Sequence, residues 1–89
     1  MYRIVLECSG VPAAEGPEAA TDIEREFRDH RPHQQNVECT FDDGKLVLRA
    51  DNDFDADGRA LMDEFSDCIS AYIATAFDGD LKLVSSTAI

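Results

Sequence analysis

Four stretches of the chain alternate between apolar and polar residues, and this period of two predicts β-strands. The first spans residues 2–8, where Tyr2, Ile4, Leu6 and Cys8 point to one face and the residues between them to the other. Two more flank Asp43-Gly44 within residues 37–51, and the last spans residues 81–86. We therefore expect a sheet of four strands.

The dipeptide Asp43-Gly44 favours a two-residue turn that joins the second and third strands as a hairpin. If Asp42 lies opposite Lys45, then Glu38 lies opposite Arg49 and Val37 opposite Ala50. In this register apolar residues face apolar residues and opposite charges face each other, an arrangement that stabilises paired strands.

Two other segments carry apolar residues at helical spacing. In the first, Pro17 suits the first helical position, and the helix should end before Pro32. Its apolar stripe consists of Ala20, Ile23 and Phe27. The second helix should span about four turns and end at residues 78–80. Its stripe consists of Leu61, Phe65, Cys68, Ile69, Tyr72, Ile73 and Ala76.

The resulting order is strand, helix, strand, strand, helix, strand, which resembles the ferredoxin-like split βαβ plait. The resemblance covers residues 1–89 as one α+β domain. It implies a four-stranded antiparallel sheet in the order 4-1-3-2, with two helices on one face. Because this topology hosts many unrelated activities, it indicates no function by itself.

The charge of the chain argues against two classes of partner. Its 8 Lys and Arg stand against 19 Asp and Glu, a formal charge of −11, which repels nucleic acids and anionic membranes. RNA-binding domains of this topology also use aromatic residues for stacking where this chain has Val5 and Val47. No apolar run is long enough to cross a bilayer, so we expect a cytoplasmic protein.

The sheet face turned away from the helices is the leading candidate for a functional surface. Its expected members include four basic residues but only two acids, Glu7 and Glu38, so it sums to +2 against −13 elsewhere. The candidate interface residues are Arg3, Val5, Lys45, Val47, Arg49, Lys82 and Val84, with Thr40 and Ser86 on the same face. A strip of three valines among cations suits a homodimer or another protein partner.

A calcium-loop pattern precedes the second helix. Asp53, Asp55, Asp57 and Glu64 occupy positions one, three, five and twelve of the pattern, with Gly58 at position six. The alternative is that these acids cap the helix N-terminus. We favour capping, because the preceding segment is a strand and not a helix. A second metal hypothesis brings His30 and His33 towards the same loop.

Nucleophilic catalysis has little support in the sequence. Cys8, Cys39 and Cys68 form no CxxC pair and are expected to be buried free thiols. Cys8 and Ser9 are the candidate nucleophiles, but the topology places both histidines at the other end of the sheet. We therefore expect a non-enzymatic protein without a cofactor.

A further alternative is the binding of a small effector. Regulatory ACT-type domains share this order of strands and helices, and their glycine-bearing loop after the first strand approaches the ligand. By that resemblance, Ser9, Gly10 and Val11 are the candidate ligand-binding residues.

Overall fold

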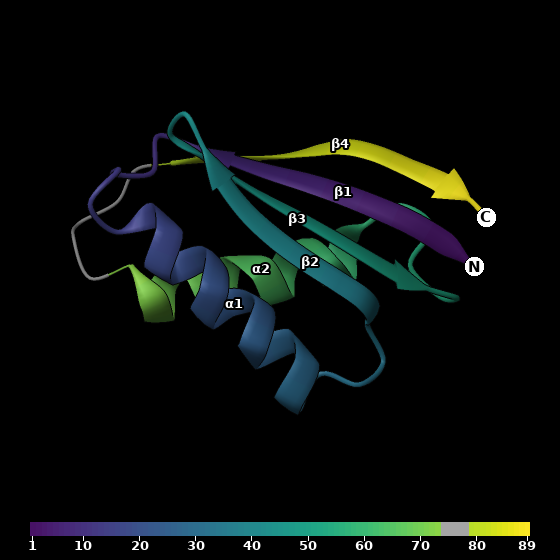
Figure 1. Cartoon of the computed structure of the whole chain (residues 1–89). Coiled ribbons are helices and arrows are strands. Elements are labelled where there is room, and N and C mark those ends of the chain that lie inside the picture. Colours follow the sequence, from purple (N-terminus) through teal and green to yellow (C-terminus); the bar gives the residue numbers. More distant parts are fainter. Residues whose placement is uncertain (74–78) are drawn as a thin grey trace.

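The computed structural model describes residues 1–73 and 79–89, which fold in the order β-α-β-β-α-β (Figure 1). The elements are β1 (Tyr2–Ser9), α1 (Gly16–His30), β2 (Gln35–Asp42), β3 (Lys45–Asn52), α2 (Arg59–Tyr72) and β4 (Asp80–Ala88). The predicted α+β class, with a four-stranded antiparallel sheet and two helices, is confirmed. The strand order is β2-β3-β1-β4.

Helix α2 has the predicted length of about four turns, but it ends earlier than the sequence predicts. It ends at Tyr72, and Ile73 is already extended, with φ −108° and ψ 107°. The expected stripe residue Ala76 and the expected stop at Asp78 lie outside the described residues. Neither described helix is long and apolar enough to cross a membrane.

The hairpin between β2 and β3 has the predicted turn. Asp43 and Gly44 both have positive φ, 50° and 77°, as a type I′ turn requires. The predicted register is confirmed from Glu38–Arg49 to Asp42–Lys45. Beyond it the ladder shifts between Gln35 and Glu38, so the predicted pairing of Val37 with Ala50 does not form.

Alternation along β1 and β3 sends one set of side chains into a single hydrophobic core. Side chains from both helices complete it, because their apolar stripes have the helical period. The largest members of the core are Ile4, Leu6, Ile23, Phe27, Leu46, Leu48, Leu61 and Phe65, all fully buried. The side chains between the core positions of β1 and β3 lie on the opposite side of the sheet.

A bulge in β4 changes which of its side chains share a face. Leu83 pairs with Leu6 and Ser85 pairs with Val5, so Val84 is an extra residue between them. After the bulge, Ser86 pairs with the core residue Ile4 and lies on the core side. Its hydroxyl donates a hydrogen bond to the carbonyl of Ala56 at 2.6 Å. The prediction that Ser86 lies on the other face is therefore wrong.

Candidate functional site

The side of the sheet opposite the core carries all seven predicted interface residues, and we call it the open face. The strand registers and the alternation of burial define its members. They include Arg3, Val5, Glu7, Ser9, Glu38, Thr40, Asp42, Lys45, Val47, Arg49, Asp51, Asp80, Lys82, Val84, Ser85 and Thr87. Val84 is exposed and sits in the bulge opposite Val5.

A shallow depression lies on the open face across β1, β2 and β3. Its lining consists of Val5, Glu38, Thr40, Val47 and Arg49, and its volume is about 140 Å³. Pockets for drug-sized ligands measure roughly 300–1,000 Å³. The depression is thus too small for such a ligand, but it can take a side chain from another protein surface.

Each of the four bases on the open face is paired with a carboxylate of the same face. Arg49 Nη2 lies 2.6 Å from Glu38 Oε2. Glu7 lies between two lysines, with its Oε1 3.7 Å from the Nζ atoms of both Lys45 and Lys82. The fourth pair joins β1 to β3 and is described below. These pairs offset the charge of each base across neighbouring strands, although the Lys45 and Lys82 side chains stay more than half exposed.

The open face is close to neutral, and the predicted charge of +2 is wrong. Asp42 and Asp51 lie on this face because they pair with Lys45 and Arg3, and Asp80 joins it because β4 begins one residue earlier than expected. With four basic and five acidic residues the open face carries −1, and the rest of the chain carries −10. Nearly all of the net negative charge of the chain therefore lies outside the open face.

Asp51 anchors Arg3 at the end of β3. The Asp51 side chain is 1% exposed and accepts hydrogen bonds from Arg3 Nε and Nη2, both at 3.0 Å, and from Asn36 Nδ2 at 2.9 Å. The bonds from Arg3 are the main reason why the pKa of Asp51 lies below its usual value, although burial opposes them. Asp51 thus stays ionised at neutral pH and fixes the guanidinium on the open face.

Asn52, the last residue of β3, forms a buried polar cluster with Gln34 and Glu64 on the core side of the sheet. The sequence analysis did not predict this cluster. Asn52 Nδ2 donates to Gln34 Oε1 at 2.9 Å, and Asn52 Oδ1 accepts from the backbone N–H groups of Phe54 and Asp55 at 3.2 and 2.9 Å. Gln34 Nε2 in turn donates to Glu64 Oε1 at 2.9 Å. An Asn that closes a turn is a local signal, but nothing near Gln34 marks it as buried.

The aspartates of the calcium-loop pattern act as helix caps. Asp55 is buried, and its two carboxylate oxygens accept the backbone N–H groups of Ala60 and Leu61 at 3.1 and 3.0 Å. Asp57 accepts the N–H of Arg59 at 3.4 Å. These are the first three N–H groups of α2, which have no partner within the helix. The preferred capping interpretation is confirmed for Asp55 and Asp57.

Glu64, the last residue of the calcium-loop pattern, contacts residues that follow α1 and not the aspartates of the pattern. Its carboxylate accepts from Arg31 Nη1 at 3.1 Å and lies 2.9 Å from His33 Nε2. His30 lies 3.8 Å from Glu26 on α1. The structure therefore does not bring Asp53, Asp55, Asp57 and Glu64 together. Among the described residues no group of three or more His, Cys, Asp or Glu could hold a metal ion.

The contrast between Asp55 and Asp53 gives a test of this capping role. Replacing Asp55 by alanine should lower the free energy of unfolding by about 1–2 kcal/mol, because two N–H groups at the start of α2 lose their acceptor. Replacing the exposed Asp53 by alanine should change it by less than about 0.5 kcal/mol. Urea unfolding followed by circular dichroism measures both. Equal losses, or Ca²⁺-dependent stability that both variants abolish, would contradict capping.

The candidate effector loop packs against the hairpin turn. The Val11 side chain is in the core, and its backbone N–H donates to Gly44 O at 2.9 Å. Gly10 has φ 78°, and a Cβ there would lie 3.8 Å from Gly79 Cα. The N–H of Val11 is thus already used within the fold, and of the three predicted residues Ser9 and Gly10 remain outside the core.

The three cysteines are free and buried, as predicted. Burial, helped by the nearby Asp80 carboxylate, raises the pKa of the Cys8 thiol to about 11. Burial likewise raises the pKa of Cys39 to about 12, and it raises that of Cys68. Because the thiolate is the nucleophile, these protonated thiols are poorly suited to covalent catalysis near neutral pH.

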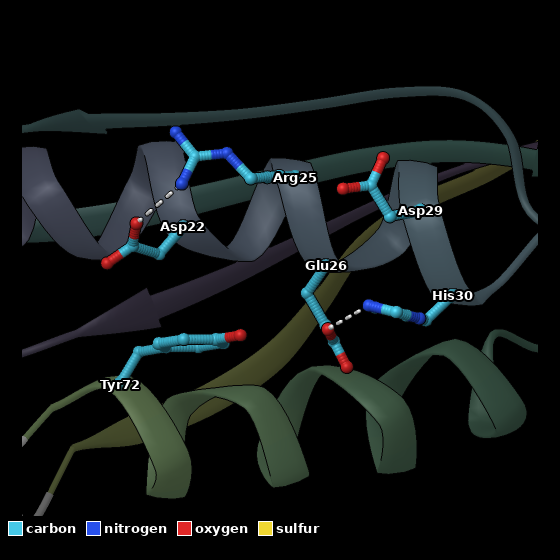
Figure 2. Close-up of a pocket in the computed structure, with 6 residues that line it drawn as sticks. All are labelled: Asp22, Arg25, Glu26, Asp29, His30 and Tyr72. Carbon is cyan, nitrogen blue, oxygen red and sulfur yellow. Dashed lines mark ion pairs between the residues drawn. The ribbon is translucent and has the colours of Figure 1, made fainter.

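A groove also lies between the two helices (Figure 2). Its lining consists of Asp22, Arg25, Glu26, Asp29, His30 and Tyr72. Arg25 pairs with Asp22 at 3.7 Å, which offsets part of the negative charge of the groove, and His30 Nε2 lies 3.8 Å from Glu26 Oε2. The groove holds carboxylates and one phenol, but no thiol that could act as a nucleophile.

These observations define an acidic α+β protein with one near-neutral sheet face. No protein-family model matches the sequence. A search of curated proteins also finds no match.

Proposed function

We propose that the protein is a small non-enzymatic protein–protein interaction module that self-associates through the open face. The observation that carries the proposal is the distribution of charge. The open face carries −1, whereas the rest of the chain carries −10. Two copies that met through an acidic surface elsewhere on the chain would bring many like charges together, and this repulsion opposes association. On the near-neutral open face a second copy meets little of this repulsion.

The chemistry of the open face supports a protein partner. Val5 and Val47 form the apolar floor of the depression, and the Arg49–Glu38 pair lies at its rim. Interfaces between proteins commonly have such an apolar centre within a polar rim. Hydrogen bonds to Asp51 and Glu38 already hold Arg3 and Arg49, so these two side chains lose less entropy on docking than free arginines would.

We also infer that the arrangement is the ferredoxin-like plait. Read from β4, the strand order is β4-β1-β3-β2, with antiparallel neighbours throughout. In Figure 1 the two helices lie side by side below the sheet. This arrangement supports the proposal because it leaves the opposite sheet face without a covering layer, as is common in antiparallel sheets.

Substitution of Val47 by glutamate tests the proposed interface. In a two-fold assembly it places two extra carboxylates at the centre of the contact, so we expect the dissociation constant to rise at least tenfold. Sedimentation equilibrium of the wild type and the variant, across micromolar to millimolar concentrations, measures this change.

Two further variants compare the open face with a helix surface. Lys82→Glu replaces the cation beside Glu7 by a second carboxylate, so it should weaken self-association modestly. Asp67→Lys on α2 should leave association through the open face largely intact. A wild type that remains monomeric at millimolar concentration would rule out self-association. Association unchanged by Val47→Glu would place the contact elsewhere.

A further inference from the structure

The two edge strands of the sheet, β2 and β4, differ in whether another element lies beside them. The β2 edge lies beside α1, and Glu24 of that helix accepts a hydrogen bond from the backbone N–H of Cys39 at 3.0 Å. The β4 edge has no further strand next to it, and no other element of the described chain runs along its outer side in Figure 1. An uncovered edge is a template for pairing with another strand.

The direction of the backbone groups of β4 follows from its ladder with β1. Ile89 N donates to Met1 O at 3.0 Å, so these two residues form a hydrogen-bonded pair. In an antiparallel ladder such pairs alternate with pairs that are not hydrogen bonded. Ser86 and Ala88, opposite Ile4 and Tyr2, therefore direct their N–H and C=O groups away from β1.

The bulge at Val84 is one protection against edge pairing, but the side chains that follow it lack two others, charge and proline. Natural edge strands are commonly protected by charged residues or proline, and the segment from Leu83 to Ile89 contains neither. Leu83, Val84 and Ile89 are also 41%, 51% and 57% exposed. In a chain of which 30% of residues are charged, this segment is a place where a second copy can approach without opposing charged side chains.

We infer that a second copy of this chain pairs with β4, strand to strand and antiparallel, about a two-fold axis at Ser86. Ser86 exchanges both backbone hydrogen bonds with its counterpart, and Ser85 lies opposite Thr87 of the second copy. Lys82 and Asp80 lie beyond the paired segment, so no like charges meet. The two sheets become one of eight strands. This inference goes beyond the proposed self-association, because it adds a contact between copies at the sheet edge that does not involve the open face.

Ser86→Pro tests the inference, because proline lacks the outward N–H that the second copy would bind. The hydrogen bonds between β4 and β1 stay intact, since none of them uses this N–H. Ser86→Ala is the matched control, since it keeps the N–H and loses only the hydroxyl bond to Ala56. Both changes are made in the wild type and in Val47→Glu, and sedimentation equilibrium gives the masses. Thermal melting by circular dichroism verifies folding, and Ala88→Pro near the strand end replaces Ser86→Pro if that variant unfolds.

The inference predicts that Val47→Glu remains dimeric, that adding Ser86→Pro weakens this dimer at least tenfold, and that adding Ser86→Ala does not. A monomeric Val47→Glu protein would overturn edge pairing and leave the open-face proposal standing. Unchanged mass on addition of proline would also overturn it. Conversely, a wild-type dimer abolished by Ser86→Pro but unaffected by Val47→Glu supports the edge and refutes the open face.

Discussion

Replacement of Asn52 by alanine is expected to lower the free energy of unfolding by about 2–4 kcal/mol. Asn52 is fully buried, and its amide satisfies the N–H groups of Phe54 and Asp55 as well as the side-chain oxygen of Gln34. Alanine leaves these three groups without that partner, and Gln34 Oε1 and the Asp55 N–H lie in buried residues. An unpaired buried polar group costs about 1–3 kcal/mol.

A double-mutant cycle with Gln34→Ala separates this network from a simple loss of packing. Gln34→Ala alone should cost about 1–2 kcal/mol, and the double variant should cost clearly less than the sum, because the Asn52–Gln34 bond is then counted once. Urea unfolding monitored by circular dichroism provides the three differences. Additive losses would show that the two amides act independently, and a loss under 1 kcal/mol for Asn52→Ala would contradict the expected penalty.

Gly58→Ala is expected to cost about 2–3 kcal/mol, from two separate causes. Gly58 has φ 75°, a left-handed conformation that disfavours any side chain. A Cβ there would also lie 3.1 Å from both Ile4 Cγ2 and Leu83 Cδ1. Ile4 is fully buried, so it has little room to move. The close approach of the α2 N-terminus to the sheet therefore depends on a residue without a side chain.

Gly44→Ala is the matched control for the backbone cause alone. Gly44 has nearly the same φ, 77°, but a Cβ there would meet no atom closer than Val11 O at 3.9 Å. We expect a loss of about 1–2 kcal/mol, smaller than that of Gly58→Ala. Leu83→Ala in the Gly58→Ala background should recover part of the difference. Equal losses at the two glycines would mean that crowding against the core contributes nothing.

Local patterns predicted most of the fold. The alternation in β1 places Ile4, Leu6 and Cys8 in the core, and Asp43-Gly44 sets the hairpin register over five residue pairs. Both signals depend only on near neighbours in the sequence: a period of two and a turn that requires positive φ. They were therefore readable without knowledge of the tertiary structure.

Features that depend on distant contacts were not predicted. The extra residue Val84 in β4 follows from its pairing with β1, and it reversed the face of Ser86. The pairing of Asp51 with Arg3 and of Asp80 with Ser9 places two more acids on the open face, and these remove the expected positive charge. Burial of Gln34 depends on Asn52 and Glu64, which come from two other parts of the chain. No local pattern carries that information.

The place of β1 in the centre of the sheet also bears on how the chain folds. Its two neighbours are both distant in sequence, since Tyr2 pairs with Asn52 on one side and with Ala88 on the other. Only β2 and β3 are joined by a short turn. Closing long loops costs more chain entropy than closing a hairpin, and such non-local pairing slows folding. We therefore expect the β2–β3 hairpin to form before the pairing of β1 with β3 and β4.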